Sequence, residues 1–189
     1  MRLALCCSFA ILVAARSAAA QGVMANRWGL TVGLGAQALK SSDTAGADDV
    51  GFATYELGGR FRIIPSIEVA LSLAAGANRD DSYSGLWADF RYRFMAERPW
   101  NIYAYFGLGA GSAGAKDGSD AERHGRGALR LGGGVERRFD VFALSAELRV
   151  LGFAANDQSP PVAPPTTRYE LSHDSIAGLG LVLGATYYF

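Results

Sequence analysis

The sequence contains very little cysteine, and its cysteines lie in an N-terminal segment that the mature protein would not retain. Among 189 residues, only Cys6 and Cys7 are cysteines, and both lie within the apolar run at residues 3–15. Arg2 precedes this run, and residues 18–20 are alanines of the kind found at signal cleavage sites. We therefore expect residues 1–20 to be a cleaved signal peptide. Residues 21–189 would then form one exported domain without a thiol or disulfide.

Long hydrophobic runs and an excess of basic residues are also missing. Residues 3–15 are too few to cross a bilayer as a helix, which needs about 20 apolar residues. No later window has the period of an amphipathic helix. Without Arg2 and Arg16, the remaining 16 basic residues stand against 18 acidic ones, a net charge of −2. We expect no nucleic-acid partner, because nucleic-acid binding requires a basic excess.

The chain does have alternation of apolar and polar residues, with the period of two that is typical of β-strands. Each alternating stretch extends over about ten to twelve residues or slightly more, the length of a tilted membrane-spanning strand. Eight such segments follow one another: 27–39, 51–64, 67–77, 85–95, 101–112, 128–139, 142–153 and 171–189. The pattern predicts an all-β protein.

The connections between these segments alternate in length. The longer, polar connections are residues 40–50, 78–84, 113–127 and 154–170, and the short ones are 64–66, 96–100 and 140–141. In outer-membrane barrels, short turns lie in the periplasm and longer loops lie outside. We therefore predict an eight-stranded antiparallel up-and-down transmembrane β-barrel. Both of its termini would lie in the periplasm.

The two faces of the predicted strands differ in charge. Arg137 is the exception on an otherwise nearly uncharged apolar face, whereas the other face carries seven arginines and five carboxylates. A soluble eight-stranded barrel would turn its apolar face inward, but this distribution favours a membrane barrel with paired charges inside. The predicted lumen residues are Glu56, Arg60, Arg62, Glu68, Asp89, Arg91, Arg93, Arg130, Glu136, Arg138, Glu147 and Arg149.

These charges are expected to fill the lumen, because eight strands enclose a space only wide enough for side chains. Arg62 and Glu68 flank the turn at Pro65 and should be near neighbours. Arg93 is predicted to face Tyr105 in the next hairpin, a cation–π contact. A narrow water-filled path remains the alternative, because glycines would leave room at positions 107, 109, 111, 132 and 134.

Aromatic residues on the apolar face gather near the predicted periplasmic ends of the strands. Such a girdle is typical of a membrane interface. Its predicted members are Trp28, Phe61, Phe94, Trp100, Phe139, Phe142, Tyr187 and Phe189.

The signal at residues 1–20, the eight alternating segments and the terminal Tyr187-Tyr188-Phe189 together resemble the small eight-stranded outer-membrane barrels of the OmpA transmembrane-domain and OmpX type. The resemblance covers nearly all of residues 21–189 and concerns architecture, so it is specific for fold and not for function. It implies contact with outer-membrane lipid and lipopolysaccharide. It also implies that Tyr187 and Phe189 are read by the barrel-assembly machinery. We expect a monomer.

One short motif suggests catalysis. Eight-stranded lipid A deacylases use a His-x-Ser pair, which His173 and Ser175 resemble. In that family, Asn follows the Ser and an orienting carboxylate stands about a dozen residues later, whereas Ile176 and Tyr187 occupy those positions here. Without an orienting group, His173 is a weak base for Ser175. The ordinary interpretation is a polar rim where the last strand leaves the membrane.

These observations favour a non-enzymatic outer-membrane barrel with a structural or surface-interaction role and a plugged lumen. A narrow pore for small solutes and a lipid A-modifying enzyme are the alternatives. The third polar connection, 113–127, shows no ligand spacing for a metal. The acids of the first two, Asp43, Asp48, Asp49, Asp80 and Asp81, could bind divalent cations, but their ordinary interpretation is solvated loop residues. We expect no metal site and no cofactor.

Overall fold

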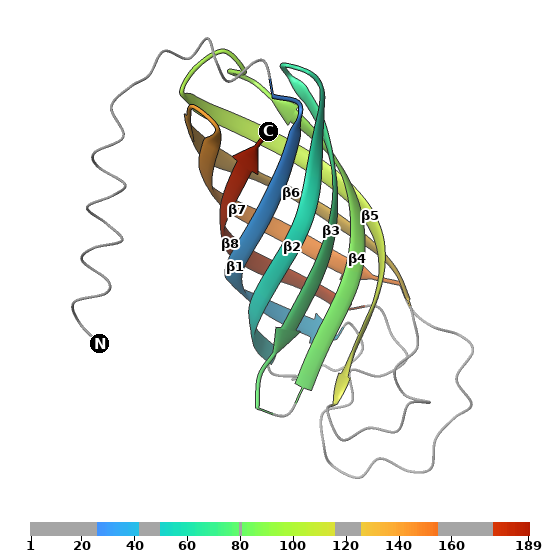
Figure 1. Ribbon diagram of the computed structural model, residues 1–189. Coiled ribbons are helices and arrows are strands. Elements are labelled where there is room, and N and C mark those ends of the chain that lie inside the picture. Colours follow the sequence, from blue (N-terminus) through green and yellow to red (C-terminus); the bar gives the residue numbers. More distant parts are fainter. Residues whose placement is uncertain (1–25, 42–49, 80, 116–125, 155–175) are drawn as a thin grey trace, which may run out of the picture.

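The fold is given by a computed structural model whose described residues are 26–41, 50–79, 81–115, 126–154 and 176–189. These residues contain eight β-strands (Figure 1). In chain order they are β1 Trp28–Ser41, β2 Val50–Ile64, β3 Ile67–Ala77, β4 Asp81–Arg93, β5 Trp100–Ala115, β6 Arg126–Phe139, β7 Phe142–Phe153 and β8 Ile176–Tyr188. No helix in the described ranges is long and apolar enough to cross a membrane.

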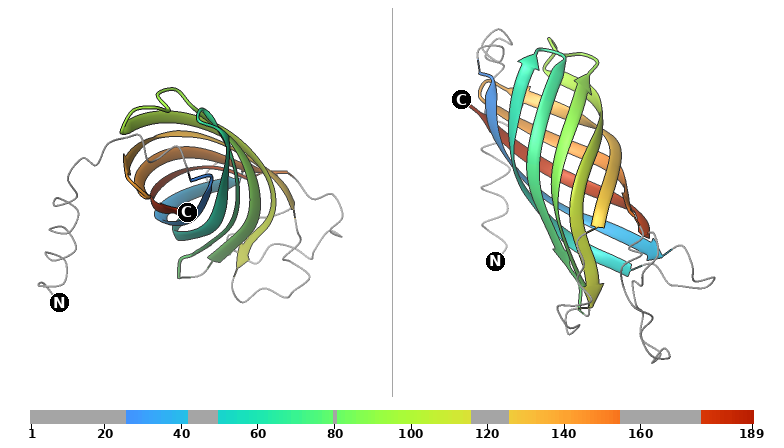
Figure 2. Two further views of the ribbon diagram at one scale, coloured as in Figure 1. Left: turned by 45° about the horizontal axis from the view of Figure 1, so that its top comes forward. Right: turned by 90° about the vertical axis from the view of Figure 1, so that its right-hand side faces the viewer.

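The strands form one closed barrel in which every strand pairs antiparallel with its neighbours in the sequence. β8 returns to β1 and closes the ring, with registers that run from Gly29↔Tyr188 to Ser41↔Ile176. Figure 2 shows the closed ring from two further directions. The predicted eight-stranded antiparallel up-and-down barrel is confirmed.

The strand registers give the barrel a stagger of ten residues. A path that crosses from each strand to the residue directly opposite starts at Phe52 and returns to β2 at Arg62, ten positions further along. The residues on this path are Phe52, Gln37, Gly180, Arg149, Gly132, Tyr105, Arg91, Glu68 and Arg62. A stagger of this kind tilts the strands against the barrel axis (Figure 1). Side chains at one height therefore come from different positions along their strands.

The two ends of the barrel differ in their connections. At the end that we call the turn end, residues 65–66, 94–99 and 140–141 join the strands. Asn26 and Phe189 lie at this end too, where the Phe189 N–H donates a hydrogen bond to the Trp28 carbonyl oxygen (2.9 Å). At the opposite loop end, the connections are 42–49, 78–80, 116–125 and 154–175.

The β4–β5 hairpin extends further toward the loop end than its sequence pattern indicated. β4 begins at Asp81 and β5 ends at Ala115, and these two residues are opposite each other in the register. The sequence there is rich in Gly and Ser, so alternation of side-chain type fades while the backbone ladder continues. At the turn end, β4 stops at Arg93 instead of continuing to residue 95. The Phe94 N–H still donates to the Ile102 carbonyl oxygen (2.9 Å).

The distribution of apolar residues is inverted relative to a soluble domain. The outward face is a continuous apolar belt, on which Leu148 and Leu179 are each 68% exposed. The inward face holds most of the buried charges, among them Arg130 and Glu136 at 1% exposure each. The lumen is therefore the packed core of the protein.

The inward glycines make room for large side chains, and these side chains fill the space in front of the glycines. A Cβ atom at Gly132 would lie 2.6 Å from Cζ of Tyr105, and one at Gly109 would lie 2.6 Å from Cε3 of Trp87. Glycines 107, 111 and 134 are similarly close to Asp89, Phe153 and the Tyr103 hydroxyl, respectively. The expectation that these five glycines leave free space is therefore wrong, because a neighbouring side chain occupies the space in front of each.

Substituting Gly132 tests this packing. Gly132→Ala should lower the free energy of unfolding by about 1–3 kcal/mol, because its Cβ meets both the Tyr105 ring and the Leu148 carbonyl oxygen at 2.7 Å. Gly59→Ala is the matched control, since a Cβ there has no neighbour within 4 Å. Urea unfolding in detergent micelles measures both variants. Equal stabilities would contradict the packing argument.

Candidate functional site in the barrel lumen

The structure places all twelve predicted lumen residues on the inward face of the barrel. Eleven of them are buried, and the Glu56 side chain is 10% exposed. They come from β2, β3, β4, β6 and β7. The stagger of the barrel brings them together in three groups at successive heights.

The first group, which we call the turn-end cluster, consists of Arg60, Glu68, Arg93, Glu136 and Arg138. Arg93 Nη2 lies 2.7 Å from Glu68 Oε2 and 3.3 Å from Glu136 Oε1. Glu136 Oε1 also accepts from Arg138 Nε (2.7 Å), and its Oε2 accepts from Arg60 Nη1 (3.2 Å). Glu136 thus bridges three guanidinium groups.

Arg62 and Tyr188 border the turn-end cluster. Arg62 lies opposite Glu68 in the register, as predicted, and its Nη1 donates to the Asn26 carbonyl oxygen (3.2 Å). Its guanidinium stands 4.8 Å from the centre of the Tyr188 ring. The Tyr188 hydroxyl accepts from Arg93 Nη2 (2.8 Å) and donates to Glu68 Oε2 (3.3 Å).

The second group is centred on Glu147. Its two carboxylate oxygens accept from the Tyr103 and Tyr105 hydroxyls (3.0 Å each) and from Arg91 Nη2 (3.2 Å). Arg91 also lies 5.1 Å and 4.9 Å from the centres of the Tyr103 and Tyr105 rings. The carboxylate and both rings therefore hold one guanidinium.

The predicted contact between Arg93 and Tyr105 is wrong. The β4–β5 register sets Arg91 opposite Tyr105, and Arg93 opposite Tyr103. The hydrogen bond from the Phe94 N–H to the Ile102 carbonyl oxygen continues this register toward the turn. Arg91 makes the cation–π contacts instead.

The third group lies nearest the loop end and is centred on Arg130. Its Nη2 donates to Glu56 Oε1 (3.0 Å) and Ser72 Oγ (2.8 Å), and its guanidinium also pairs with Asp89. Glu56 in turn accepts from Arg149 Nη1 (2.6 Å). The Arg130 guanidinium also lies 4.8 Å from the Trp87 ring centre. Arg130 thus connects the charged part of the lumen to an apolar part.

That apolar part was not predicted, and we call it the loop-end plug. Phe52 contacts Tyr83, and Trp87 contacts Phe153, with ring centres 5.9 Å and 6.2 Å apart. Its members are Leu39, Phe52, Ala74, Tyr83, Trp87, Leu151, Phe153 and Ile176. The signal was present in the sequence, since these large apolar residues lie on the polar parity near the loop ends of their strands. Arg126, also buried, was missed as well.

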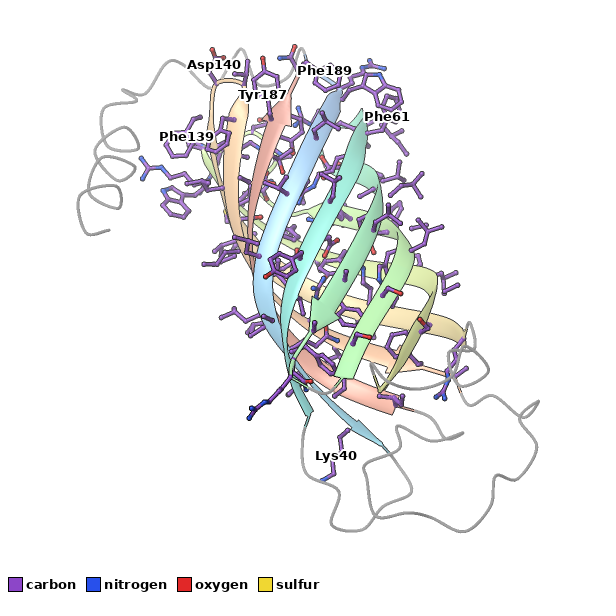
Figure 3. All side chains as sticks on the ribbon, turned by 60° about the horizontal axis from the view of Figure 1, so that its bottom comes forward. Lys40, Phe61, Phe139, Asp140, Tyr187 and Phe189 are labelled. Carbon is purple, nitrogen blue, oxygen red and sulfur yellow. The ribbon has the colours of Figure 1, made fainter. Side chains whose placement is uncertain are left out.

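The predicted girdle residues lie at the turn end and point outward. Figure 3 shows Phe61, Phe139, Tyr187 and Phe189 together at this end, with Lys40 at the other. Ring pairs form between Trp28 and Phe61 (4.6 Å), Phe139 and Phe142 (6.2 Å), and Tyr187 and Phe189 (6.4 Å). Phe94 packs on Tyr92 (5.1 Å), and Arg137 lies over Trp100 (5.3 Å) and Phe139 (5.1 Å).

The candidate catalytic pair lies elsewhere in the chain. His173 and Ser175 fall outside the described residues. Within the described ranges, no group of three or more His, Cys, Asp or Glu side chains is arranged to hold a metal ion.

Known proteins give the same picture of the fold. A family model described as "Outer membrane protein beta-barrel domain" matches residues 7–189. Neisserial surface protein A has a similar structure, with a TM-score of 0.65 and 14% identity over 86% of this chain and 97% of that chain. Ail, the attachment invasion locus protein of Yersinia pestis, gives a TM-score of 0.54 and 17% identity over 87% and 99%. OprG from Pseudomonas aeruginosa gives 0.53 and 9% over 87% and 96%. No curated protein sequence matches the chain.

Glu136 should be among the most sensitive positions in the lumen. Glu136→Gln removes the charge that three guanidiniums share, so we expect a loss of about 3–5 kcal/mol in the free energy of unfolding. Arg137→Gln, one residue along but on the exposed outer face, is the control and should change stability far less. Equilibrium unfolding of both in lipid vesicles measures this. Similar losses would show that the lumen network does not stabilise the barrel.

Proposed function

Since the chain belongs to the outer membrane protein β-barrel family, we propose that it is a closed, non-enzymatic barrel of the bacterial outer membrane. Its role is structural or lies in surface interaction through the connections at its loop end. The observation that carries this proposal is the filled lumen. Three groups of paired charges and the loop-end plug follow one another along its length.

The outer surface supports placement in a membrane. The belt of exposed leucines, valines and aromatic residues has no covering element among the described residues, and lipid would cover it. The girdle at the turn end fits one membrane interface. Short turns are periplasmic in this class of barrel, so we propose that the turn end faces the periplasm and the loop end faces outward.

The lumen contacts argue against conduction. Arg130 on β6 pairs with Glu56 on β2 and Asp89 on β4, so its side chain extends across the lumen. A permeating ion would have to separate these pairs, and breaking a buried ion pair is costly. On the loop side of this barrier, the side chains of the loop-end plug pack against one another, with Phe52 on Tyr83 and Trp87 on Phe153. The narrow-pore alternative therefore has less support.

Surface interaction remains the more specific part of the proposal. Two barrels of similar fold are named a surface protein and an attachment invasion locus protein. We extend surface interaction to this chain as a hypothesis, with outer-membrane lipid and lipopolysaccharide around a monomeric barrel. We also propose that the outward-facing Tyr187 and Phe189, 53% and 58% exposed, are read by the barrel-assembly machinery during insertion.

Conductance tests the closed lumen. Purified barrel in planar bilayers should give no steady single-channel steps, because paired charges and the loop-end plug fill the lumen. A large porin incorporated under the same conditions verifies that insertion would be detected. Reproducible steps of uniform size from the wild-type barrel would overturn the proposal in favour of a narrow pore.

Lipid chemistry tests the non-enzymatic assignment. Wild type and Ser175→Ala, incubated with lipopolysaccharide, should leave the same set of acyl chains when lipid A is analysed by mass spectrometry. If the wild type removes an acyl chain and Ser175→Ala does not, the protein is a lipid A-modifying enzyme instead.

A further inference from the structure

The turn-end cluster holds more positive than negative charge. Arg60, Arg93 and Arg138 share two carboxylates, Glu68 and Glu136, so one positive charge is in excess within this group. All five side chains are at most 4% exposed. A buried charge without a counter-charge is strongly unfavourable. This excess calls for a negative charge that the side chains of the group do not supply.

The same region contains three buried donors with no hydrogen-bond partner in the described part of the chain. They are Arg93 Nη1, Asn101 Nδ2 and Arg138 Nη2. Their residues are 2%, 1% and 6% exposed and come from the adjacent strands β4, β5 and β6. Leaving a buried donor unsatisfied costs free energy, so three neighbouring ones point to a bound acceptor.

The surrounding contacts bring these three residues together. Arg93 and Arg138 both reach the same oxygen, Glu136 Oε1, at 3.3 Å and 2.7 Å. Asn101 lies opposite Glu136 in the β5–β6 register. Its Oδ1 accepts from the Met95 N–H (3.3 Å), so the amide nitrogen is left as its free donor. Arg138 Nη1 donates to the Ala96 carbonyl oxygen (3.4 Å), which places the group beneath the β4–β5 turn.

We propose that the barrel binds one small monovalent anion, of the chemical class of chloride, between Arg93, Asn101 and Arg138. Three N–H donors from two guanidiniums and an amide match a halide, which accepts hydrogen bonds and donates none. Glu68 Oε1 also lacks a hydrogen bond, but it lies 3.9 Å from Arg60 Nη1 and is already a salt-bridge partner. The five side chains carry a net positive charge, and Arg62 at their border is a further cation, so the group favours an anion. The nearby carboxylates oppose a second negative charge. This site is independent of whether the barrel conducts.

Chloride-dependent stability is the first test. The unfolding midpoint of the detergent-solubilised barrel should rise with chloride and then saturate, measured against gluconate at constant ionic strength, because a ligand that binds only the folded state stabilises it. Bromide should substitute for chloride. A midpoint that does not respond to either halide would show that water alone satisfies these donors and would overturn the proposal.

Two amide-to-acid variants locate the effect. Asn101→Asp places a fixed negative charge in the site and should abolish the chloride response. The matched control is Gln37→Glu on β1. Gln37 is also a buried amide, but both its donor Nε2 and its acceptor Oε1 lack hydrogen-bond partners, and water can satisfy both whereas an anion cannot. This control should keep the response. Equal loss in both variants would show that the halide is not held at the turn-end cluster.

A direct readout keeps the test valid if Asn101→Asp fails to fold. Wild-type crystals grown with bromide should show an anomalous peak in contact with the Arg93, Asn101 and Arg138 nitrogens. Its absence from that position would overturn the proposal, whatever the variants do.

Discussion

The closure of β8 on β1 with a stagger of ten residues is the constraint on which the other features depend. This stagger determines both the tilt of the strands and which side chains meet in the lumen. Glu136 on β6 meets Arg60 on β2 and Arg93 on β4 because each strand presents a different part of its length at that height. A register shift of two residues in any one hairpin would keep every side chain on its face and still replace these partners. The charge pairs therefore also favour the correct register.

Filling this lumen requires residues of unequal size in alternation around the ring. Tyr105 lies against Gly132, and Trp87 lies against Gly109. Each large ring occupies the space that a side chain on the glycine would otherwise fill. The result is a core with two chemical parts. Paired charges occupy the turn end and the middle, and the apolar loop-end plug occupies the remainder. Arg130 joins them, since its guanidinium contacts Glu56 and Asp89 and also lies over Trp87.

Period-two alternation and the alternating connection lengths predicted the eight strands, the closed barrel and the inward face of the twelve lumen charges. They could not predict which inward residues share a height, because height depends on the register of every hairpin. The β4–β5 hairpin is an example, because Arg91 and not Arg93 lies opposite Tyr105. The loop-end plug was missed for a related reason. Leu39, Phe52 and Phe153 each look like an isolated apolar residue on a polar face until the closed ring brings them together.

The choice of arginine as the lumen cation has a consequence for what else the lumen must hold. Each guanidinium carries five N–H donors in a fixed planar arrangement, whereas a carboxylate has two oxygens. Three arginines surround Glu136, and Glu68 is the only other carboxylate in the turn-end cluster. The N–H donors of these arginines therefore outnumber the carboxylate oxygens that can accept from them. Adding a third carboxylate side chain would correct the balance, but β5 presents Asn101 at this height instead. A small anion supplies the missing charge without requiring a side chain of its own, which is why we place it beside that asparagine.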